Sequence, residues 1–594
     1  MIIFKVLCLL CALELDVTKI DTSIRHLLNP FKVDYFAVML LFGILFYFFK
    51  KINGKISKRK KILCGLFSFF TLISQSYMKV GSWYLVFGNF LNFFLSIYFW
   101  LGYYFLFERL FVLFDQYLHK EEKKIKLPFL FHHFDDHPFL FSFVFLFLCY
   151  GIYILAFYPG ILSNDPSFQI MQYFNIPNKY SEYSVLLDPN VHLTNHHPIF
   201  HTLLLGSCIS IGRWMGSDNF GLFIYTIIQM TFLITVLSYS ISYTKKVNIS
   251  LKRRIILLSI YAFVPMFPFY GMSLVKDTFY TCFILLYIIF LYDYIQFYNK
   301  KKYHVKQFCF VLLLLLCICA FRNNGFYVVL FSFPCIFIFE KSRKQWILLF
   351  CLFLCLHVGY TKILLPSFKI TNGSIREALS IPFQQTARYN RYYQEEVTDE
   401  EKEIINQILP YQKMLQKYDP EISDPVKNQF NRYATKEDLK KYFSVWEKQF
   451  LKHPNMYIEA TIHNTYGYIY PGKTNWYLYS KYSPIVKERN VVDYHYNSLK
   501  SLRQFLTAYG NVFLYIPFLG LISNIGFGNW IIMIMSIYYI ERKKRKNLLF
   551  LMPCYLSFLV CLASPVNCYF RYAMPIIFSI PFLWTIFLKE IKNN

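Results

Sequence analysis

Apolar runs recur along most of the chain, separated by short polar segments. Each run has about 16 to 24 residues, close to the length a helix needs to cross roughly 30 Å of hydrocarbon. The pattern predicts an all-α polytopic membrane protein with about 13 transmembrane helices. The expected spans are 33–49, 62–78, 84–107, 138–158, 220–243, 255–272, 278–297, 307–321, 326–340, 346–363, 513–540, 547–563 and 573–589.

Composition and charge distribution support this interpretation. Of 594 residues, 56% are hydrophobic and 16% are charged, too few polar side chains to cover a water-soluble globule of this size. The formal net charge of +27 comes from short basic clusters between the apolar runs, which is typical of cytoplasmic loops and not of nucleic-acid binding. These clusters are 50–61, 120–126, 245–254, 300–306, 340–344 and 541–546.

Cysteine usage and the N-terminus add little about function. The 15 cysteines lie mostly in apolar runs and none falls within 364–512, which argues against an extracellular disulfide framework. Residues 1–13 are apolar but short, and no small-residue cleavage site follows them. A signal anchor, a partial span and an interfacial helix all remain open for this segment.

The basic clusters also predict a topology. If all of them are cytoplasmic, the spans alternate consistently only when 198–212 does not cross the membrane. That stretch has about 15 residues and follows the polar segment "HLTNHHPIFH", so we expect an interfacial or re-entrant helix. Segment 131–137 then stays inside. The polar segments expected outside are 159–219, 274–279, 321–326, 364–512 and 564–572.

Four parts follow from this topology. Residues 1–130 form an accessory bundle of membrane helices, and 131–363 form a transmembrane core with the outer loop 159–219. Residues 364–512 form a mostly helical extracytoplasmic domain, and 513–594 form the C-terminal transmembrane helices. The chain has no P-loop, no GxGxxG after a strand and no pair of CxxC motifs, and the cytoplasmic loops are too short for a nucleotide-binding domain.

Asp165 lies in "YPGILSNDPSFQ", directly after an expected span. One interpretation is structural: Asn164 or Asp165 caps a helix that begins at Pro166. The other is a general base that removes a proton from an acceptor hydroxyl at the membrane surface. Gln169 and Gln172 lie four and seven residues further, so they share a helix face with Asp165 and are candidates for binding a sugar.

The pair His196-His197 precedes the expected interfacial helix. Adjacent histidines seldom converge on one metal ion, and no carboxylate stands at ligand spacing beside them. Capping of the following helix and contact with substrate are the alternatives to metal binding. No cofactor is expected, and a divalent metal is possible but not favoured.

Several charged residues stand in tight turns at the expected outer face. Ionisable groups near membrane depth are costly, so they are usually paired or functional. Structural ion pairs or interface anchors are one interpretation. The other is binding of a lipid phosphate, for which arginine offers a matching fork of donors. The candidates are Lys276, with Asp277 orienting it, Arg322, Asn323, Asn324 and Arg571.

Five segments carry a resemblance: "YPGILSNDPSFQ", "NHHPIFHTLLLG", "SLVKDTF", "REALSIPFQQTARY" and "YGYIYPG". Together they resemble an uncharacterised bacterial integral-membrane family of unknown function over about residues 140–590. That family is similar in layout to the GT-C glycosyltransferases, which transfer a sugar from a polyprenyl phosphate carrier outside the membrane.

The resemblance implies an inverting transferase in a bacterial cell membrane, with its active site extracytoplasmic and Asp165 as catalytic base. The implied partners are a polyprenyl-phosphate-linked sugar donor, an envelope glycan, lipid or protein acceptor, and the lipid bilayer, with no nucleic acid. The 364–512 domain would close over the acceptor through Arg388 and Tyr466. The alternatives are a transporter or flippase of lipid-linked envelope glycans, a glycan polymerase, and a structural scaffold.

Overall fold

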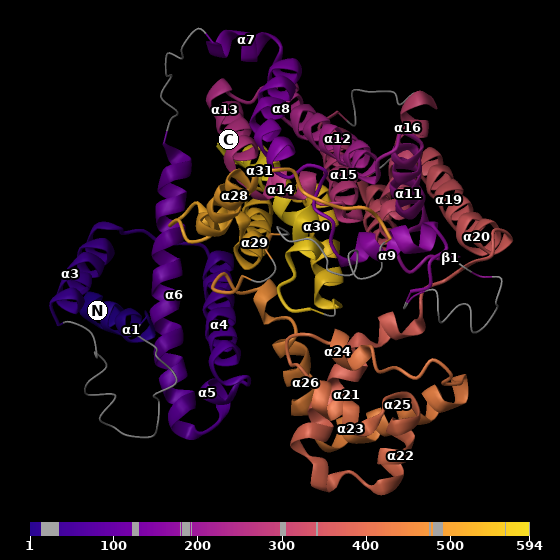
Figure 1. The fold of residues 1–594 in the computed structure, drawn as a ribbon. Helices are drawn as coiled ribbons and strands as arrows, with labels where there is room; N and C mark the ends of the chain where they lie inside the picture. The colour runs from indigo at the N-terminus through magenta and orange to yellow at the C-terminus, as the bar shows by residue number, and fades with distance from the viewer. Residues whose placement is uncertain are drawn as a thin grey trace.

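The computed structural model describes a nearly all-helical protein (Figure 1), which confirms the helical fold class. Within the described residues, seven helices are long and apolar enough to cross a membrane, or eight if the bent pair α13–α14 forms one span. The 13 expected spans are not confirmed, because several other apolar helices are short. The described residues are 1–13, 35–120, 130–178, 180, 191, 193–297, 305–339, 343–474, 477–478, 491–564 and 566–592.

The N-terminal helices form a bundle with its own apolar core. Gly81 ends α4 in the left-handed conformation, at φ 72°, where a residue with a side chain would be strained. Helix α6 packs against both α1 and α4. The helices are α1 (Ile2–Leu13), α3 (Tyr35–Lys51), α4 (Lys58–Val80), α5 (Tyr84–Phe87) and α6 (Phe90–His119).

The largest hydrophobic core joins the central and C-terminal helices. Helix α11, which covers the stretch expected not to cross, packs on α9 and α12 and has 16 residues, fewer than the helices that qualify as spans. The central helices are α7 (Leu130–Asp136), α8 (Pro138–Ala156), α9 (Asn164–Tyr173), α11 (Ile199–Trp214), α12 (Asp218–Lys246), α13 (Leu251–Phe263), α14 (Met266–Met272), α15 (Lys276–Phe297), α16 (Val305–Phe321), α17 (Gly325–Ser332), η2 (Phe333–Cys335), α18 (Ile336–Phe339), α19 (Arg343–Gly359), η3 (Tyr360–Leu364) and α20 (Leu365–Ser367).

The C-terminal helices complete this core, with α31 buried over most of its length between α15, α29 and α30. Helix α28 instead carries an apolar face exposed at Phe505 and Val512. The elements are α28 (Lys500–Phe513), η7 (Gly520–Ser523), α29 (Ile525–Glu541), η8 (Arg545–Asn547), α30 (Leu548–Leu562) and α31 (Phe570–Lys592).

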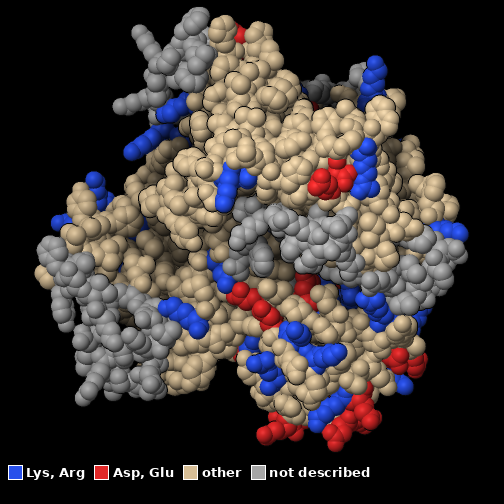
Figure 2. Space-filling view, in the orientation of Figure 1, with Lys and Arg blue, Asp and Glu red and all other residues tan. Residues whose placement is uncertain are grey.

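Residues 375–463 form a separate helical lobe at the lower end of the molecule (Figure 1). It has its own apolar core, and capping boxes at Thr398 and Thr435 start two of its helices. Charged side chains crowd its surface, whereas the helices above are largely uncharged (Figure 2). The elements are η4 (Ile375–Leu379), α21 (Ser380–Tyr392), η5 (Gln394–Glu396), α22 (Asp399–Ile408), α23 (Tyr411–Lys417), α24 (Asp424–Lys427), α25 (Lys436–Lys452) and α26 (Pro454–His463), followed by η6 (Tyr466–Tyr468).

Short backbone pairings join segments that are far apart in the sequence. Strand β1 (Leu193–Thr194) pairs in parallel with β2 (Ile370–Thr371). An isolated parallel bridge links Ile161 to Ser273, and an antiparallel bridge links Ile422 to Val566. These pairings bring the loop after α8, the start of α15, the helical lobe and the loop before α31 to one place.

Candidate functional site

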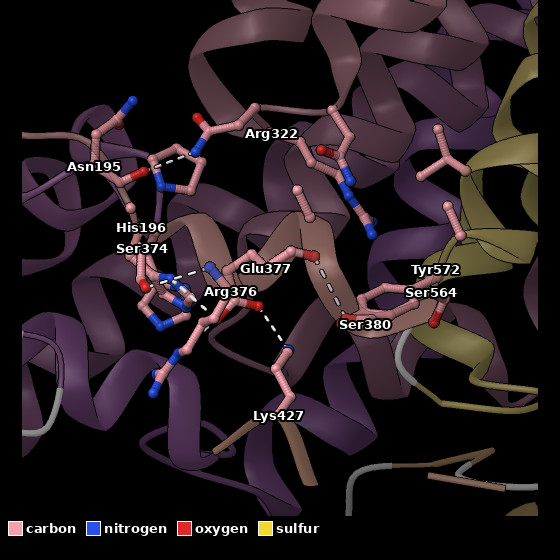
Figure 3. Close-up of a pocket in the computed structure, with 18 of the residues that line it drawn as sticks. Asn195, His196, Arg322, Ser374, Arg376, Glu377, Ser380, Lys427, Ser564 and Tyr572 are labelled. Atoms are coloured by element: carbon pink, nitrogen blue, oxygen red, sulfur yellow. Dashed lines mark hydrogen bonds and ion pairs between the residues drawn. The ribbon is translucent and has the colours of Figure 1, made fainter. Parts of the chain in front are cut away.

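A cavity of about 710 Å³ lies where the helical lobe meets the ends of the apolar helices (Figure 3). Eight of the residues predicted from the sequence line it, although they come from five separate stretches of the chain. They are Asp165, His196, His197, Lys276, Arg322, Asn323, Asn324 and Arg571.

Asp165 is held at the cavity by a backbone bridge and by its helix. The Ile161 N–H donates to the Met272 carbonyl at 2.8 Å, which places the start of α9 beside the start of α15. Helix α9 begins at Asn164 and its N-cap is Ser163, one or two residues earlier than expected, so Asp165 lies in the first turn. The positive end of the helix dipole favours a carboxylate there.

Asp165 belongs to a chain of alternating charges. Arg571 Nη2 donates to Asp165 Oδ2 at 2.5 Å, and Lys276 Nζ lies 3.7 Å from the same oxygen. Arg571 Nε lies 2.9 Å from Asp277 Oδ2, and Arg322 Nη1 donates to Asp277 Oδ1 at 2.5 Å. Burial alone would disfavour the charged carboxylate, but its neighbours, Arg571 foremost, outweigh burial and hold the pKa of Asp165 well below its usual range.

Asp277 does not line the cavity but supports it from behind. Its side chain is only 1% exposed and lies between the two guanidinium groups. Arg322 is also enclosed by aromatic rings, with Cζ 5.4 Å from the Tyr280 centroid and 4.7 Å from the Tyr572 centroid. Both arginines are therefore fixed in position beside the cavity.

The histidine pair links the two sides of the cavity. Lys276 Nζ donates to His197 Nδ1 at 2.8 Å, so a neutral His197 carries its proton on Nε2, which has no hydrogen-bond partner within the described residues. His196 stacks on Tyr180, with ring centroids 4.0 Å apart. Burial lowers the pKa of His196 to about 4 and that of His197 well below its usual value, with Lys276 adding to the effect on His197. Asn195 Oδ1, and neither histidine, accepts from the N–H of Ile199 at the start of α11.

The opposite side of the cavity comes from the helical lobe and was not predicted from the sequence. Lys427 Nζ donates to Glu377 Oε2 at 2.6 Å and lies 2.7 Å from Asp424 Oδ1. Arg376 Nε lies 3.3 Å from Glu377 Oε1, and His196 Nδ1 lies 3.9 Å from the same oxygen. Figure 3 shows Glu377 between Lys427 and Arg322. We call Arg376, Glu377, Asp424 and Lys427 the lobe side, and Asp165, Lys276, Arg322 and Arg571 the helix side.

Besides Asp277, four predicted site residues lie outside the cavity. Gln169 and Gln172 are about 1% exposed and face α11 and β1, where their Nε2 groups donate to Thr202 and Thr194. The helical spacing placed them correctly on one face, but that face packs inside the protein.

Arg388 and Tyr466, expected to close over an acceptor, instead join parts of the fold. Arg388 Nη2 lies 2.5 Å from Glu459 Oε2 and donates to the Gly81 carbonyl at 3.2 Å, so it ties the helical lobe to the end of α4. Tyr466 donates to Glu421 Oε1 at 2.6 Å.

The charge of the cavity favours an anionic group on one side only. The helix side and Asp277 behind it hold three cations and two carboxylates, whereas the lobe side holds two of each. Within the described ranges, no three His, Cys, Asp or Glu side chains form a group able to hold a metal ion. The site therefore presents two arginines and a lysine to an anion, next to the carboxylate of Asp165.

The helices and this polar cavity fit a multi-pass membrane protein with a ligand site at the boundary of its apolar region. The chain belongs to a family of unknown function (DUF6020), whose model matches residues 183–594. The match starts after Asp165 and Tyr180 and includes the rest of the cavity lining. This confirms the resemblance to an uncharacterised family. No curated protein and no solved structure matches the chain.

Proposed function

We propose that the protein is a membrane glycosyltransferase of the GT-C type, which moves a sugar from a polyprenyl phosphate to an envelope acceptor. The observation that supports it most is the contact between Asp165 and Arg571 inside the cavity, because it combines a potential base with a cation suited to a phosphate leaving group. The layout inferred from the sequence supplies the class of reaction.

In this proposal the carrier phosphate binds Arg571, Lys276 and Arg322 on the helix side. The acceptor hydroxyl oxygen attacks the anomeric carbon, and the bond from that carbon to the phosphate oxygen breaks. The cations stabilise the phosphate as it leaves with the bonding electrons. Asp165 accepts the hydroxyl proton.

The contacts of Asp165 imply that its basicity depends on the donor. A carboxylate bound by a guanidinium and an ammonium group is a weak base, since both cations favour its charged form. A phosphate that takes over Arg571 and Lys276 neutralises these charges and raises the proton affinity of Asp165. The base would thus become effective only when the donor is bound.

We propose that the cavity faces the extracytoplasmic side of a bacterial membrane. Basic residues that follow the apolar helices, such as Arg254 and Lys544, pair with Asp135 and Glu590. Helix α7 and the C-terminus lie at the end of the molecule opposite the helical lobe (Figure 1). Basic loops collect in the cytoplasm, so the lobe would lie outside.

Mass spectrometry of lipids that co-purify with the protein tests the donor, and release of polyprenyl phosphate from a panel of polyprenyl-phosphate hexoses tests turnover. We expect a bound polyprenyl phosphate or its sugar conjugate, and release that depends on Asp165. Transport of a lipid-linked glycan without release, unaffected by Asp165→Asn, would contradict the proposal. A labelled tag in the helical lobe that is protected in intact cells would contradict the sidedness.

A further inference from the structure

The two sides of the cavity differ in how their charges are arranged. On the helix side, cations exceed carboxylates by one when Asp277 is included. On the lobe side, both cations are already engaged: Lys427 by Glu377 and Asp424, and Arg376 by Glu377. An anion on the lobe side would compete with these carboxylates for the same cations. The lobe side therefore offers no surplus positive charge to a ligand.

The carboxylates on the lobe side are nonetheless accessible. The side chains of Glu377 and Asp424 are 34% and 44% exposed, whereas the Lys427 side chain is 5% exposed. The cavity thus meets hydrogen-bond acceptors, with the balancing positive charge buried behind them. A carboxylate accepts hydrogen bonds from hydroxyl groups and repels other anions.

Neutral amide side chains complete the same wall. Asn372 and Asn428 are exposed and line the cavity, as do Asn323 and Asn324. An amide both donates and accepts hydrogen bonds, which matches a hydroxyl group that does both. Tyr327 is 53% exposed at the cavity and offers an apolar surface. Accessible acceptors, amides and one aromatic ring suit a ligand rich in hydroxyl groups.

The lobe side is also placed beside the proposed base. His196 contacts Glu377, and the adjacent His197 accepts from Lys276, which contacts Asp165. The pairing of β1 with β2 fixes this arrangement, because it holds the loop of His196 against the segment that carries Glu377. A ligand on the lobe side can therefore present a hydroxyl group toward Asp165.

We infer that the lobe side is a binding subsite for an uncharged, polyhydroxylated chain end, that is, a neutral glycan, and that it disfavours an anionic polymer. As an acceptor subsite this rests on the proposed function, but binding of a neutral glycan does not require turnover. Asp424 of the lobe side and Asn428 beside it are the residues whose side chains we assign to ligand hydroxyl groups.

Saturation-transfer NMR of the full-length protein in nanodiscs tests the subsite. The probes are neutral trisaccharides of glucose, galactose, mannose and N-acetylglucosamine, against a glycerol phosphate trimer. We expect at least one neutral trisaccharide to bind more tightly than the glycerol phosphate trimer. Asn428→Ala, which changes no charge, and Asp424→Asn should each weaken it at least fivefold. Asp399→Asn, at a side chain 98% exposed elsewhere on the same lobe, is the matched control.

Tighter binding of the glycerol phosphate trimer, or equal glycan binding by wild type and both variants, would overturn the inference. Failure of all the neutral probes while farnesyl phosphate still binds would also overturn it and leave the proposed donor site intact. Glycan and farnesyl phosphate binding without release of carrier phosphate would contradict the transferase but support the subsite.

Discussion

Replacing Asp165 with Asn should change two measurable properties in opposite directions. The substitution keeps the size of the side chain and removes its charge. If Asp165 is the base, turnover falls by about 10²- to 10⁴-fold, the usual contribution of a positioned base. If the phosphate uses the same cations, anion binding becomes stronger, because the neutral amide of the variant no longer competes for Arg571 and Lys276.

The size of the second effect follows from the geometry. Arg571 and Lys276 contact one carboxylate oxygen, at 2.5 and 3.7 Å, so a phosphate on these cations would lie roughly 5 Å from the carboxylate carbon. Two unit charges at that distance repel by about 3 kcal/mol at an effective dielectric constant of about 20. The Asp165 side chain is 28% exposed, and solvent screening reduces this value. We expect at least a tenfold gain in affinity, about 1.4 kcal/mol.

Farnesyl phosphate is a suitable probe, with farnesol as the control that has the same chain and no phosphate. Its affinity can be followed by tryptophan fluorescence of the protein in nanodiscs, next to carrier release with the polyprenyl-phosphate sugars. Asp399→Asn controls for the loss of one carboxylate far from the cavity. Weaker farnesyl phosphate binding by Asp165→Asn would refute the competition for Arg571. Unchanged turnover would refute the role as base.

Three further predictions concern stability. Asp277→Asn leaves Arg322 and Arg571 without their shared buried carboxylate. It should therefore lower the free energy of unfolding by about 3–5 kcal/mol, measured by thermal unfolding in nanodiscs. A smaller loss than that of Asp165→Asn would contradict the supporting role of Asp277. Glu459 pairs with the guanidinium group of Arg388 that also contacts Gly81 of the N-terminal bundle, so Glu459→Gln should loosen this contact and speed limited proteolysis of the lobe. An unchanged cleavage rate would refute this prediction. The pKa of His196 is about 4 in the fold and near 6.5 when unfolded, so the unfolded chain binds the proton first as the pH falls. Thermal stability should therefore fall between pH 6.5 and 4, and less steeply in His196→Gln. Equal slopes of stability against pH in wild type and variant would contradict this prediction.

Charge bias along the chain predicted more of the site than any single motif did. It placed Asp165, His196, Lys276, Arg322 and Arg571 on one side of a membrane, and the structure brings all five to one cavity. The reason is physical: charges are excluded from the apolar helices, so the scarce polar residues at one set of helix ends must meet where those ends converge.

Helical periodicity predicted faces but not their partners. Gln169 and Gln172 do share a face of α9, yet that face packs on Thr202 and Thr194. Period alone cannot distinguish a face that meets a cavity from one that meets a neighbouring helix, because both need polar partners. The same limit applies to Arg388, whose partner at Gly81 lies in another part of the chain.

The lobe side was missed for a related reason. In the segment "REALSIPFQQTARY" the sequence predicted a substrate contact at Arg388, whereas Arg376 and Glu377 at the start of the segment line the cavity. Their position depends on the pairing of β1 with β2, only two residues long on each side, which no alternating pattern indicates. Such short pairings gain little stability by themselves, so they persist only where the surrounding helices hold both segments in place.

The division of the cavity into two unlike sides favours a transfer reaction over transport. A transporter needs its ligand to leave on the far side, and its charged groups usually lie at mid-membrane between broken helices. Here the ion pairs stand where the apolar helices end, and Arg322 and Arg571 are fixed by Asp277 and by aromatic rings. Rigidly held cations beside a carboxylate suit stabilisation of charge that develops in place. A cavity with the proposed anion-binding side and the inferred hydroxyl-binding side would accommodate two substrates that meet at Asp165.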